Sequence, residues 1–325
     1  MLQNHKVQPK PSSHRVEVLL DNRLEKEIYN IYFPLNCMLY LYFSPKYNMR
    51  DNYITPNGKI CHIFALLSVC FVIAVSFSRV YFNQINNVMH NDGNPMLLTI
   101  TALFFTLHCT GFTTLFVFNI KNNNIQIILK IQEALKIIHY RNYKKFTIWN
   151  WLSISRPFMA YIIFLSVMQD ISALLVFYTL IFFDVNTTYG IRIISLIRDG
   201  ILKWISEVDN HIKYCFKLNE EQCKNQWKKL FQAYANLMQA FDLFKTLFKY
   251  SVNVKIFDIF LYNVQYLFFK FSAVLWILKN IALVGMFAVH CERFYLAMYK
   301  ADGACNWWLK TTQETGDDSC RLRFF

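Results

Sequence analysis

Long apolar stretches, each about as long as a membrane-crossing helix, recur along the chain and limit what it can fold into. The clearest are residues 60–82, 95–120 and 158–183. Each exceeds the roughly 20 residues that an α-helix needs to cross the hydrocarbon core. With 55% hydrophobic and only 17% charged residues among 325, the chain is too apolar for an ordinary soluble protein. The sequence therefore predicts an all-α membrane protein, a polytopic helical bundle.

Three weaker apolar stretches complete six predicted spanning helices. They are residues 189–205, 252–271 and 273–291. The first carries Arg192, Arg198 and Asp199 without the every-third-residue repeat of a voltage sensor, so we expect these charges to snorkel or to be buried against other spans. Because Arg198 and Asp199 are adjacent and point to different helix faces, no direct pair between them is expected.

The distribution of Lys and Arg predicts which connections face the cytoplasm. Eight lie in residues 1–59, seven each in 121–157 and 206–251, and five in 292–325, whereas 84–94 and 184–188 hold none. Cation-rich connections stay in the cytoplasm. Residues 28–44 (IYNIYFPLNCMLYLYFS) are apolar but contain Pro34, and if they crossed, this alternation would be lost. They are therefore interpreted as a re-entrant or interfacial helix before the first span.

The predicted organisation has three parts. A cytoplasmic N-terminus, 1–59, includes the re-entrant helix. The transmembrane bundle, 60–291, has long cytoplasmic helix extensions in its connections 121–157 and 206–251, and 292–325 form a cytoplasmic C-terminal segment. The sequon at Asn186 falls in the outer loop 184–188 and marks a possible glycosylation site. The chain is expected in the plasma membrane.

Two cytoplasmic connections carry apolar stripes at helical spacing. In residues 125–138 the stripe is Ile128, Ile131, Leu135 and Ile138. In residues 219–250 it is Trp227, Leu230, Tyr234, Leu237, Phe241, Phe244 and Phe248. The longer stripe must be covered, either by the membrane surface or by other cytoplasmic helices of this subunit or a neighbour. The second alternative is favoured, because the spacing persists through six turns.

Polar groups inside predicted spans are candidates for a ligand site, because they are costly in the bilayer. They are His108, Gln169 and Asp170, and we add the aromatic Trp276. A pocket of aromatic side chains with a few polar anchors suits a small apolar ligand. The alternative is that these groups only join helices through hydrogen bonds.

Other classes of function find little support in the sequence. No H-E-x-x-H, P-loop, G-x-S-x-G or dinucleotide motif is present, so no enzyme, cofactor or metal is expected. The net charge of +13 lies in connections between spans and does not indicate nucleic-acid binding. The nine cysteines include no C-x-x-C, and no disulfide framework is predicted.

Two stretches resemble a known receptor family. LFQAYANLMQAFDLFKTLF (230–248) is similar to the L-x-x-x-Y-x-x-L pattern ahead of the fifth span of insect gustatory receptors, and AVHCERFYLAMYKADGACNWWL (288–309) is similar to their A-C-E stretch after the sixth. The resemblance implies a ligand-gated cation channel, a homo- or hetero-tetramer with other gustatory receptor subunits, that detects small tastant molecules. It also implies assembly through cytoplasmic helices.

The sequence departs from the family pattern at its end. No seventh span follows GDDSCRLRFF, and the family's signature, T-Y followed by an apolar run and Q-F, is absent. We therefore expect that the chain as it stands does not conduct, whether it represents a truncated isoform or an incomplete gene model. The alternatives are a membrane transporter or accessory subunit, and a G-protein-coupled receptor, whose N-terminus would lie outside.

Overall fold

The computed structural model describes residues 22–41, 45–64, 66–67, 70, 74, 123–167, 171–215, 220–266 and 270–314. Within these ranges, most side chains of 160–183 and all those of 249–277 are not described. Nearly all of the described chain is helical. The prediction of a mainly α-helical protein is confirmed.

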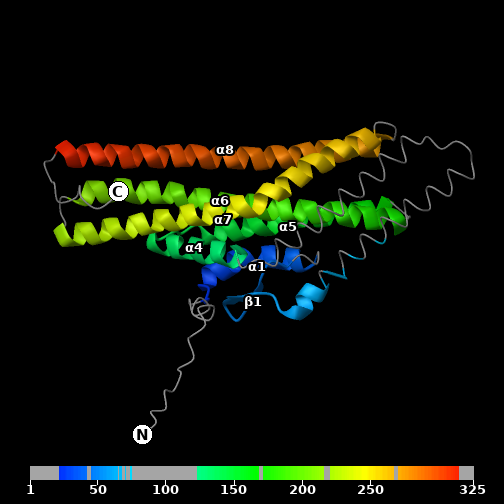
Figure 1. The fold of residues 1–325 in the computed structure, drawn as a ribbon, viewed down its shortest axis with the longest axis horizontal. Helices are drawn as coiled ribbons and strands as arrows, with labels where there is room; N and C mark the ends of the chain where they lie inside the picture. Colours follow the sequence, from blue (N-terminus) through cyan, green and yellow to red (C-terminus); the bar gives the residue numbers. More distant parts are fainter. Residues whose placement is uncertain are drawn as a thin grey trace, which may run out of the picture.

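Three very long helices run side by side along the longest axis of the molecule (Figure 1). They are α6 (Ile171–Cys215), α7 (Glu220–Tyr266) and α8 (Lys270–Glu314). The chain passes back and forth through them, so neighbouring helices are antiparallel. α6 packs along both α7 and α8.

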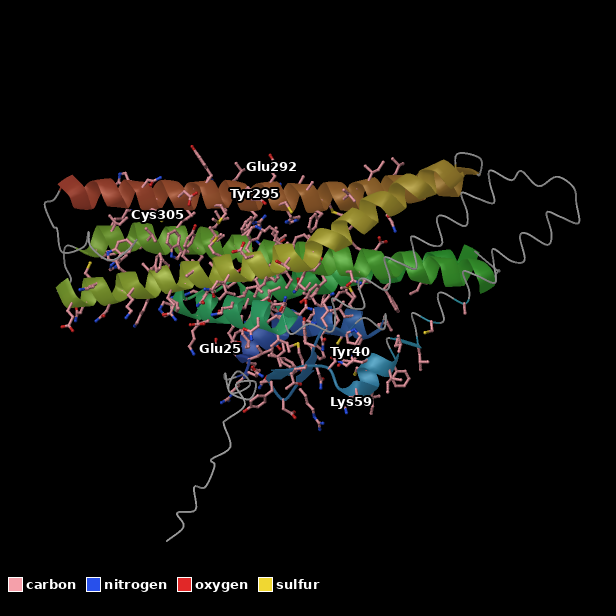
Figure 2. The ribbon with its side chains drawn as sticks, in the orientation of Figure 1. Glu25, Tyr40, Lys59, Glu292, Tyr295 and Cys305 are labelled. Carbon is pink, nitrogen blue, oxygen red and sulfur yellow. The ribbon has the colours of Figure 1, made fainter. Side chains whose placement is uncertain are left out.

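Three shorter helices and a small β-ribbon lie on the side away from α8 (Figure 1). α4 (Asn123–Ile137) packs mainly against α7, while α5 (Tyr143–Val167) packs against α1 (Lys26–Leu41) and α6. Figure 2 shows how far these layers are separated: Glu25 and Tyr40 lie near α1, and Tyr295 and Cys305 lie along α8.

The boundaries of the long helices differ from the predicted spans. The predicted span 158–183 contains the end of α5 and the start of α6, so it is not one helix. The predicted outer loop 184–188 is helical, and the predicted span 189–205 continues the same helix. The loop prediction was wrong because the polar run Asn186-Thr187-Thr188 was interpreted as a break between helices, although buried polar groups can remain helical when the helix packs around them.

The predicted helix 28–44 is present as α1, with Pro34 inside it and one face buried. Its 16 residues extend about 24 Å, less than the roughly 30 Å of a hydrocarbon core. Gln132 ties α4 to the start of α1, because its Nε2 donates to the Arg23 carbonyl and its Oε1 accepts from the Glu25 amide. α1 is therefore part of the packed body.

A two-stranded antiparallel ribbon that the sequence analysis missed follows α1. Strands β1 (Asn48–Arg50) and β2 (Tyr53–Thr55) are joined by Asp51 and Asn52, both with positive φ. A two-residue turn of this kind suits the twist of a hairpin, and Asp and Asn tolerate the left-handed conformation. The Leu24 amide donates to the Asn52 carbonyl, which holds the ribbon beneath α1.

The helix α4 ends in a well-defined cap. His139 adopts a positive φ of 49°. The Tyr140 amide donates to the Leu135 carbonyl and the His139 amide to the Lys136 carbonyl. This is the pattern of a Schellman cap, and it turns the chain sharply from α4 into α5.

One described helical segment is long and apolar enough to cross a membrane. It is Leu278–Trp307 within α8, with a mean hydropathy of 1.4 and 22% of its most apolar window buried. It begins and ends later than the predicted span 273–291. The predicted spans 60–82 and 95–120 lie largely or wholly outside the described residues.

Candidate functional site

A cluster of polar side chains joins α1, α5, α6 and α8 at the middle of the bundle, and we call it the polar junction: Asn150, Arg192, Ser195 and His290. Asn150 is fully buried on α5. Its Nδ2 donates to the Ile31 carbonyl of α1 at 2.8 Å, and its Oδ1 accepts from Arg192 Nε at 2.5 Å. One amide therefore links three helices.

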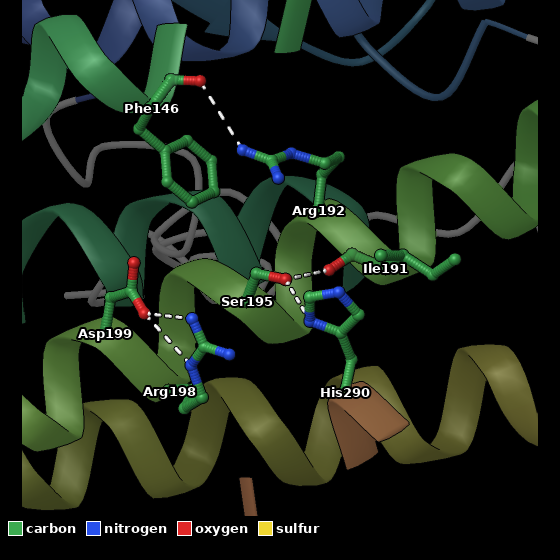
Figure 3. Close-up of polar contacts among 7 residues, drawn as sticks. All are labelled: Phe146, Ile191, Arg192, Ser195, Arg198, Asp199 and His290. Atoms are coloured by element: carbon green, nitrogen blue, oxygen red, sulfur yellow. Dashed lines mark hydrogen bonds and ion pairs between the residues drawn. The ribbon is translucent and has the colours of Figure 1, made fainter. Parts of the chain in front are cut away.

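Arg192 of α6 is held by α5 on two sides. Its guanidinium stacks over the Phe146 ring with Cζ 4.2 Å from the ring centroid, and Nη2 reaches the Phe146 carbonyl at 3.5 Å (Figure 3). A planar guanidinium can stack on a ring and donate hydrogen bonds at its edge at the same time. The Arg192 charge therefore packs against another helix, α5, as expected.

Ser195 and His290 link α6 to α8 (Figure 3). The Ser195 hydroxyl donates to the Ile191 carbonyl at 2.6 Å, and Ser195 Oγ lies 2.8 Å from His290 Nδ1. Because the hydroxyl has one proton, which the carbonyl receives, His290 Nδ1 must carry a proton and donate to the serine. The serine is not activated as a nucleophile, and the pair serves to join two helices.

Arg198 and Asp199 correct a prediction. The Arg198 Nε and Nη2 donate to Asp199 Oδ1 at 3.0 and 2.6 Å. The prediction that adjacent residues on a helix do not pair was wrong, because the long arginine side chain folds along the helix surface to reach its neighbour. Figure 3 shows this pair on the same helix as Ser195.

A second polar connection between α6 and α8 lies nearer the start of both helices. Asp184 Oδ2 accepts a hydrogen bond from Lys279 Nζ. The Asp184 side chain is 10% exposed and that of Lys279 is 35% exposed. Asn280 is buried beside Lys279 in the sequence, and its Oδ1 has no hydrogen-bond partner among the described residues.

Two aromatic rings of the long helices lie beside a buried lysine, Lys46, that precedes the ribbon. Lys46 Nζ lies 5.4 Å from the Tyr189 ring centroid and 6.0 Å from that of Phe248. Burial lowers the pKa of Lys46 to about 7, whereas the two rings favour its charged form. Tyr47 is also fully buried there, and burial raises the pKa of its phenol.

The α7 stripe is packed within its own chain. Leu230, Leu237, Phe241, Phe244 and Phe248 are buried, and Trp227 and Tyr234 pack against the core. The prediction that other helices cover this stripe is confirmed, and those helices belong to the same subunit. The stripe of α4 behaves in the same way, since Ile128, Ile131, Leu135 and Ile138 are fully buried.

Several predicted site residues cannot be placed. His108, Gln169 and Asp170 lie outside the described residues, and Trp276 lies in α8 without a described side chain. The ligand pocket remains a prediction. Asn186 is 1% exposed inside α6, so it is not in the surface loop that a glycan requires.

The junction of α6 and α7 holds one feature that the sequence analysis did not predict. Cys223 is disulfide-bonded, and its Sγ lies 3.6 Å from His211 Nε2. The His211 ring also meets Trp227 edge-on, with centroids 4.8 Å apart, and burial lowers the His211 pKa. Within the described ranges, no group of three His, Cys, Asp or Glu side chains is placed to hold a metal ion.

The sequence offered only weak signals for the polar junction. Asn150, Ser195 and His290 are isolated polar residues in helical segments, and nothing in their spacing indicates that α5, α6 and α8 bring them together. No family model, no curated protein and no solved structure matches this chain.

Proposed function

We propose that this chain is a subunit of the insect gustatory receptor type, a plasma-membrane chemoreceptor of the ligand-gated cation channel class that detects small tastants. The observation that carries the proposal is the length of α6, α7 and α8. They contain 45, 47 and 45 residues and so extend about 70 Å, twice the roughly 30 Å of a hydrocarbon core. One half of each helix can cross a membrane while the other half packs outside it.

The packed halves have the character of a body outside the bilayer. There, α4 and α6 to α8 bury apolar side chains against one another, including Leu237 and Phe294. They carry charged pairs, of which Lys245 with Asp242 is exposed and Lys203 with Glu207 is half-buried. Cytoplasmic extensions of crossing helices are the feature that the sequence resemblance also implies.

The proposal retains six crossings, with their limits moved to the helix boundaries of the structure. The crossings would be 60–82, 95–120, the later part of α5, the early part of α6, the later part of α7 and the early part of α8. The outer connections then become 84–94, 168–170 and 267–269, and none contains a Lys or Arg. The N-terminus stays cytoplasmic by the same rule as before.

The tastant would bind near His108, Gln169, Asp170 and Trp276, in the part of the bundle nearest the outer connections. The polar junction lies further along the same helices. A shift of α8 relative to α6 caused by the ligand would reach the bond between Ser195 and His290. We propose that the assembled receptor is a tetramer with other gustatory receptor subunits.

The crossing map is tested with epitope tags at both chain ends in intact cells. Antibodies should reach either tag only after permeabilisation. A tag reached on intact cells at the N-terminus would favour a G-protein-coupled receptor and overturn the proposal.

Function is tested by recording tastant-evoked cation current with the chain expressed alone and with other gustatory receptor subunits. A current that appears or changes its tastant preference when the chain is present supports the proposal. Solute uptake without current would favour a transporter. No effect in any combination, with the chain at the cell surface, would overturn the receptor assignment.

A further inference from the structure

The outward face of α5 near its N-terminus carries a stripe of cations and apolar side chains. Lys145, Trp149, Leu152, Arg156 and Met159 recur at spacings of three and four and are all exposed. Such spacing places them on one side of a helix. Lys144 and Trp151 flank this stripe and are exposed too.

The opposite side of α5 is the one that packs in the bundle. Phe146 and Asn150 are buried there, and Asn150 reaches α1 and α6 through its hydrogen bonds. The exposed stripe therefore points away from every described helix that α5 contacts. Two tryptophans that are nearly half exposed, Trp149 at 46% and Trp151 at 49%, are unusual on a surface that faces only water.

All charged residues on this face of α5 are positive. α5 contains no Asp or Glu, and Lys144, Lys145 and Arg156 form no ion pair with any carboxylate in the described part of the chain. The charges of Glu25 and Glu27 both act on Tyr143, and Glu25 is paired with Lys136 at 3.1 Å. The stripe is left to attract an anion from outside the bundle.

The position of the tryptophans along α5 fits a membrane boundary. From Trp149 to the last residue of α5, Val167, the helix rises about 28 Å, close to the roughly 30 Å hydrocarbon thickness. Trp149 and Trp151 would then lie at the headgroup level, where tryptophan is enriched. Lys144 and Lys145 would lie just outside it, on the cytoplasmic side.

We propose that the stripe of Lys144, Lys145, Trp149, Trp151 and Arg156 binds the headgroups of anionic phospholipids in the cytoplasmic leaflet. The inference rests on the membrane placement in the proposed function. Arg156 lies deeper along the helix, but helical side chains lean toward the N-terminus, so its guanidinium can snorkel back to the same phosphates. Each cation near an anionic leaflet contributes about fivefold in affinity.

The test uses the full chain in detergent, titrated with short-chain dioctanoyl phosphatidylserine and followed by tryptophan fluorescence, with dioctanoyl phosphatidylcholine as the neutral comparison. The triple variant Lys144→Gln, Lys145→Gln, Arg156→Gln should lose roughly a hundredfold in phosphatidylserine affinity, from three cations at about fivefold each. Its phosphatidylcholine binding should be unchanged. The difference should shrink at high salt.

The matched control is a second triple variant, Lys224→Gln, Lys228→Gln, Lys229→Gln. These three cations are exposed on α7, and their removal changes the net charge by the same amount. The control should bind phosphatidylserine like the wild type. Equal losses in both triple variants, or no loss in the α5 variant, would overturn the proposal.

A second measurement does not depend on the charges. In nanodiscs containing brominated phosphatidylcholine, the tryptophan quenching of the wild type should fall in the variant Trp149→Phe, Trp151→Phe, because both indoles lie at the lipid boundary. Unchanged quenching would overturn the proposed lipid contact. If the chain did not enter nanodiscs at all, the proposed function would fail, whereas insertion without a preference for anionic lipid would defeat this inference alone.

Discussion

The helix α6 meets its two long neighbours through different chemistry. Against α7 the polar contacts include Trp204 Nε1 with the Leu230 carbonyl and His211 with Cys223. The closest packing there involves glycine and aromatic rings: a Cβ added at Gly190 would lie 2.7 Å from Phe248 Cε1, and the rings of Trp204 and Tyr234 lie 4.8 Å apart. Against α8 the contact includes polar pairs, Ser195 with His290 and Asp184 with Lys279.

The difference indicates separate roles for the two interfaces. Close-packed apolar contact resists any change of volume, because the interior has no space to absorb it. Buried polar pairs contribute less net energy, but each is satisfied in only one relative position of the two helices. The polar pairs therefore define the register of α8 against α6.

Gly190→Leu is expected to have the largest effect on the α6–α7 interface. The new side chain would occupy the space of the Phe248 ring, and overpacking of this kind costs about 3 kcal/mol. Unfolding monitored by denaturant titration in micelles measures the loss. The second substitution Phe248→Ala should recover part of it, and a Gly190→Leu protein as stable as the wild type would refute the close approach.

Lys46, which lies beside Tyr189 of α6 and Phe248 of α7, should make the free energy of unfolding depend on pH. Its pKa is lowered to about 7 in the folded protein, so between pH 7 and its unfolded pKa near 10.4 the unfolded chain binds more protons. Below pH 7 the lysine is charged in the folded protein, and burial of this charge lowers the free energy of unfolding by its full amount. As the pH rises above 7, the folded protein loses the proton and this destabilisation disappears. Thermal stability should therefore increase from pH 7 to 9, by at most about 1.4 kcal/mol per pH unit.

The variant Lys46→Met is the control for that pH dependence. It should be more stable than the wild type below pH 7 and should lack the rise, since methionine fills similar space without a charge. The same slope in both proteins would show that other groups titrate. The Tyr47 phenol, whose pKa burial raises, stays neutral over this range and does not contribute.

Asp184→Ala tests a polar contact between α6 and α8. It leaves the Lys279 ammonium without its carboxylate in a partly buried place. The cost should be about 2 kcal/mol, below the value for a fully buried pair because Lys279 is 35% exposed. A double-mutant cycle with Lys279→Ala isolates the pair. A coupling near zero would remove Asp184 from the set of contacts that fix the α8 register.

Sequence patterns predicted the residues of the α6–α7 interface better than those of the α6–α8 interface. The α7 stripe from Trp227 to Phe248 and the α4 stripe were identified from spacing alone, because burial of a helix face repeats every three or four residues. A helix at the apolar stretch 28–44 was also predicted, and α1 occupies most of it. The boundary of α6 was misplaced, because the buried polar residues near Asn186 have the composition of a loop.

The contacts of the α6–α8 interface could not be predicted, because each depends on one residue per helix. Ser195 and His290 are 95 residues apart, and no periodicity links them. The position of Lys46 could not be predicted either. In the sequence it was one of eight cations in residues 1–59, whereas in the structure its Nζ lies near the rings of Tyr189 and Phe248. Long-range pairs of this kind arise from the tertiary arrangement and not from any local pattern.

Ser195→Ala is a milder test of the α8 register. It removes the acceptor of the His290 Nδ1 proton, and the lost hydrogen bond should cost about 1 kcal/mol. Ser153→Ala is the control, because its hydroxyl donates to the Trp149 carbonyl of its own helix and is exposed. If both substitutions had equal effects on the thermal midpoint, the bond between α6 and α8 would contribute nothing specific.

Gly303→Ala should change the free energy of unfolding least. The sign of this change separates two explanations of the stability loss expected for Gly190→Leu. Gly303 lies inside α8, is exposed, and has nothing within 4 Å of an added Cβ. Alanine there should stabilise the protein by about 0.5–1 kcal/mol, because glycine has the poorer helix propensity. A gain at 303 beside a large loss at 190 would assign the loss to contact with Phe248. Losses at both positions would instead indicate that these helices require glycine for backbone flexibility, and the shape-based account of the α6–α7 interface would then fail.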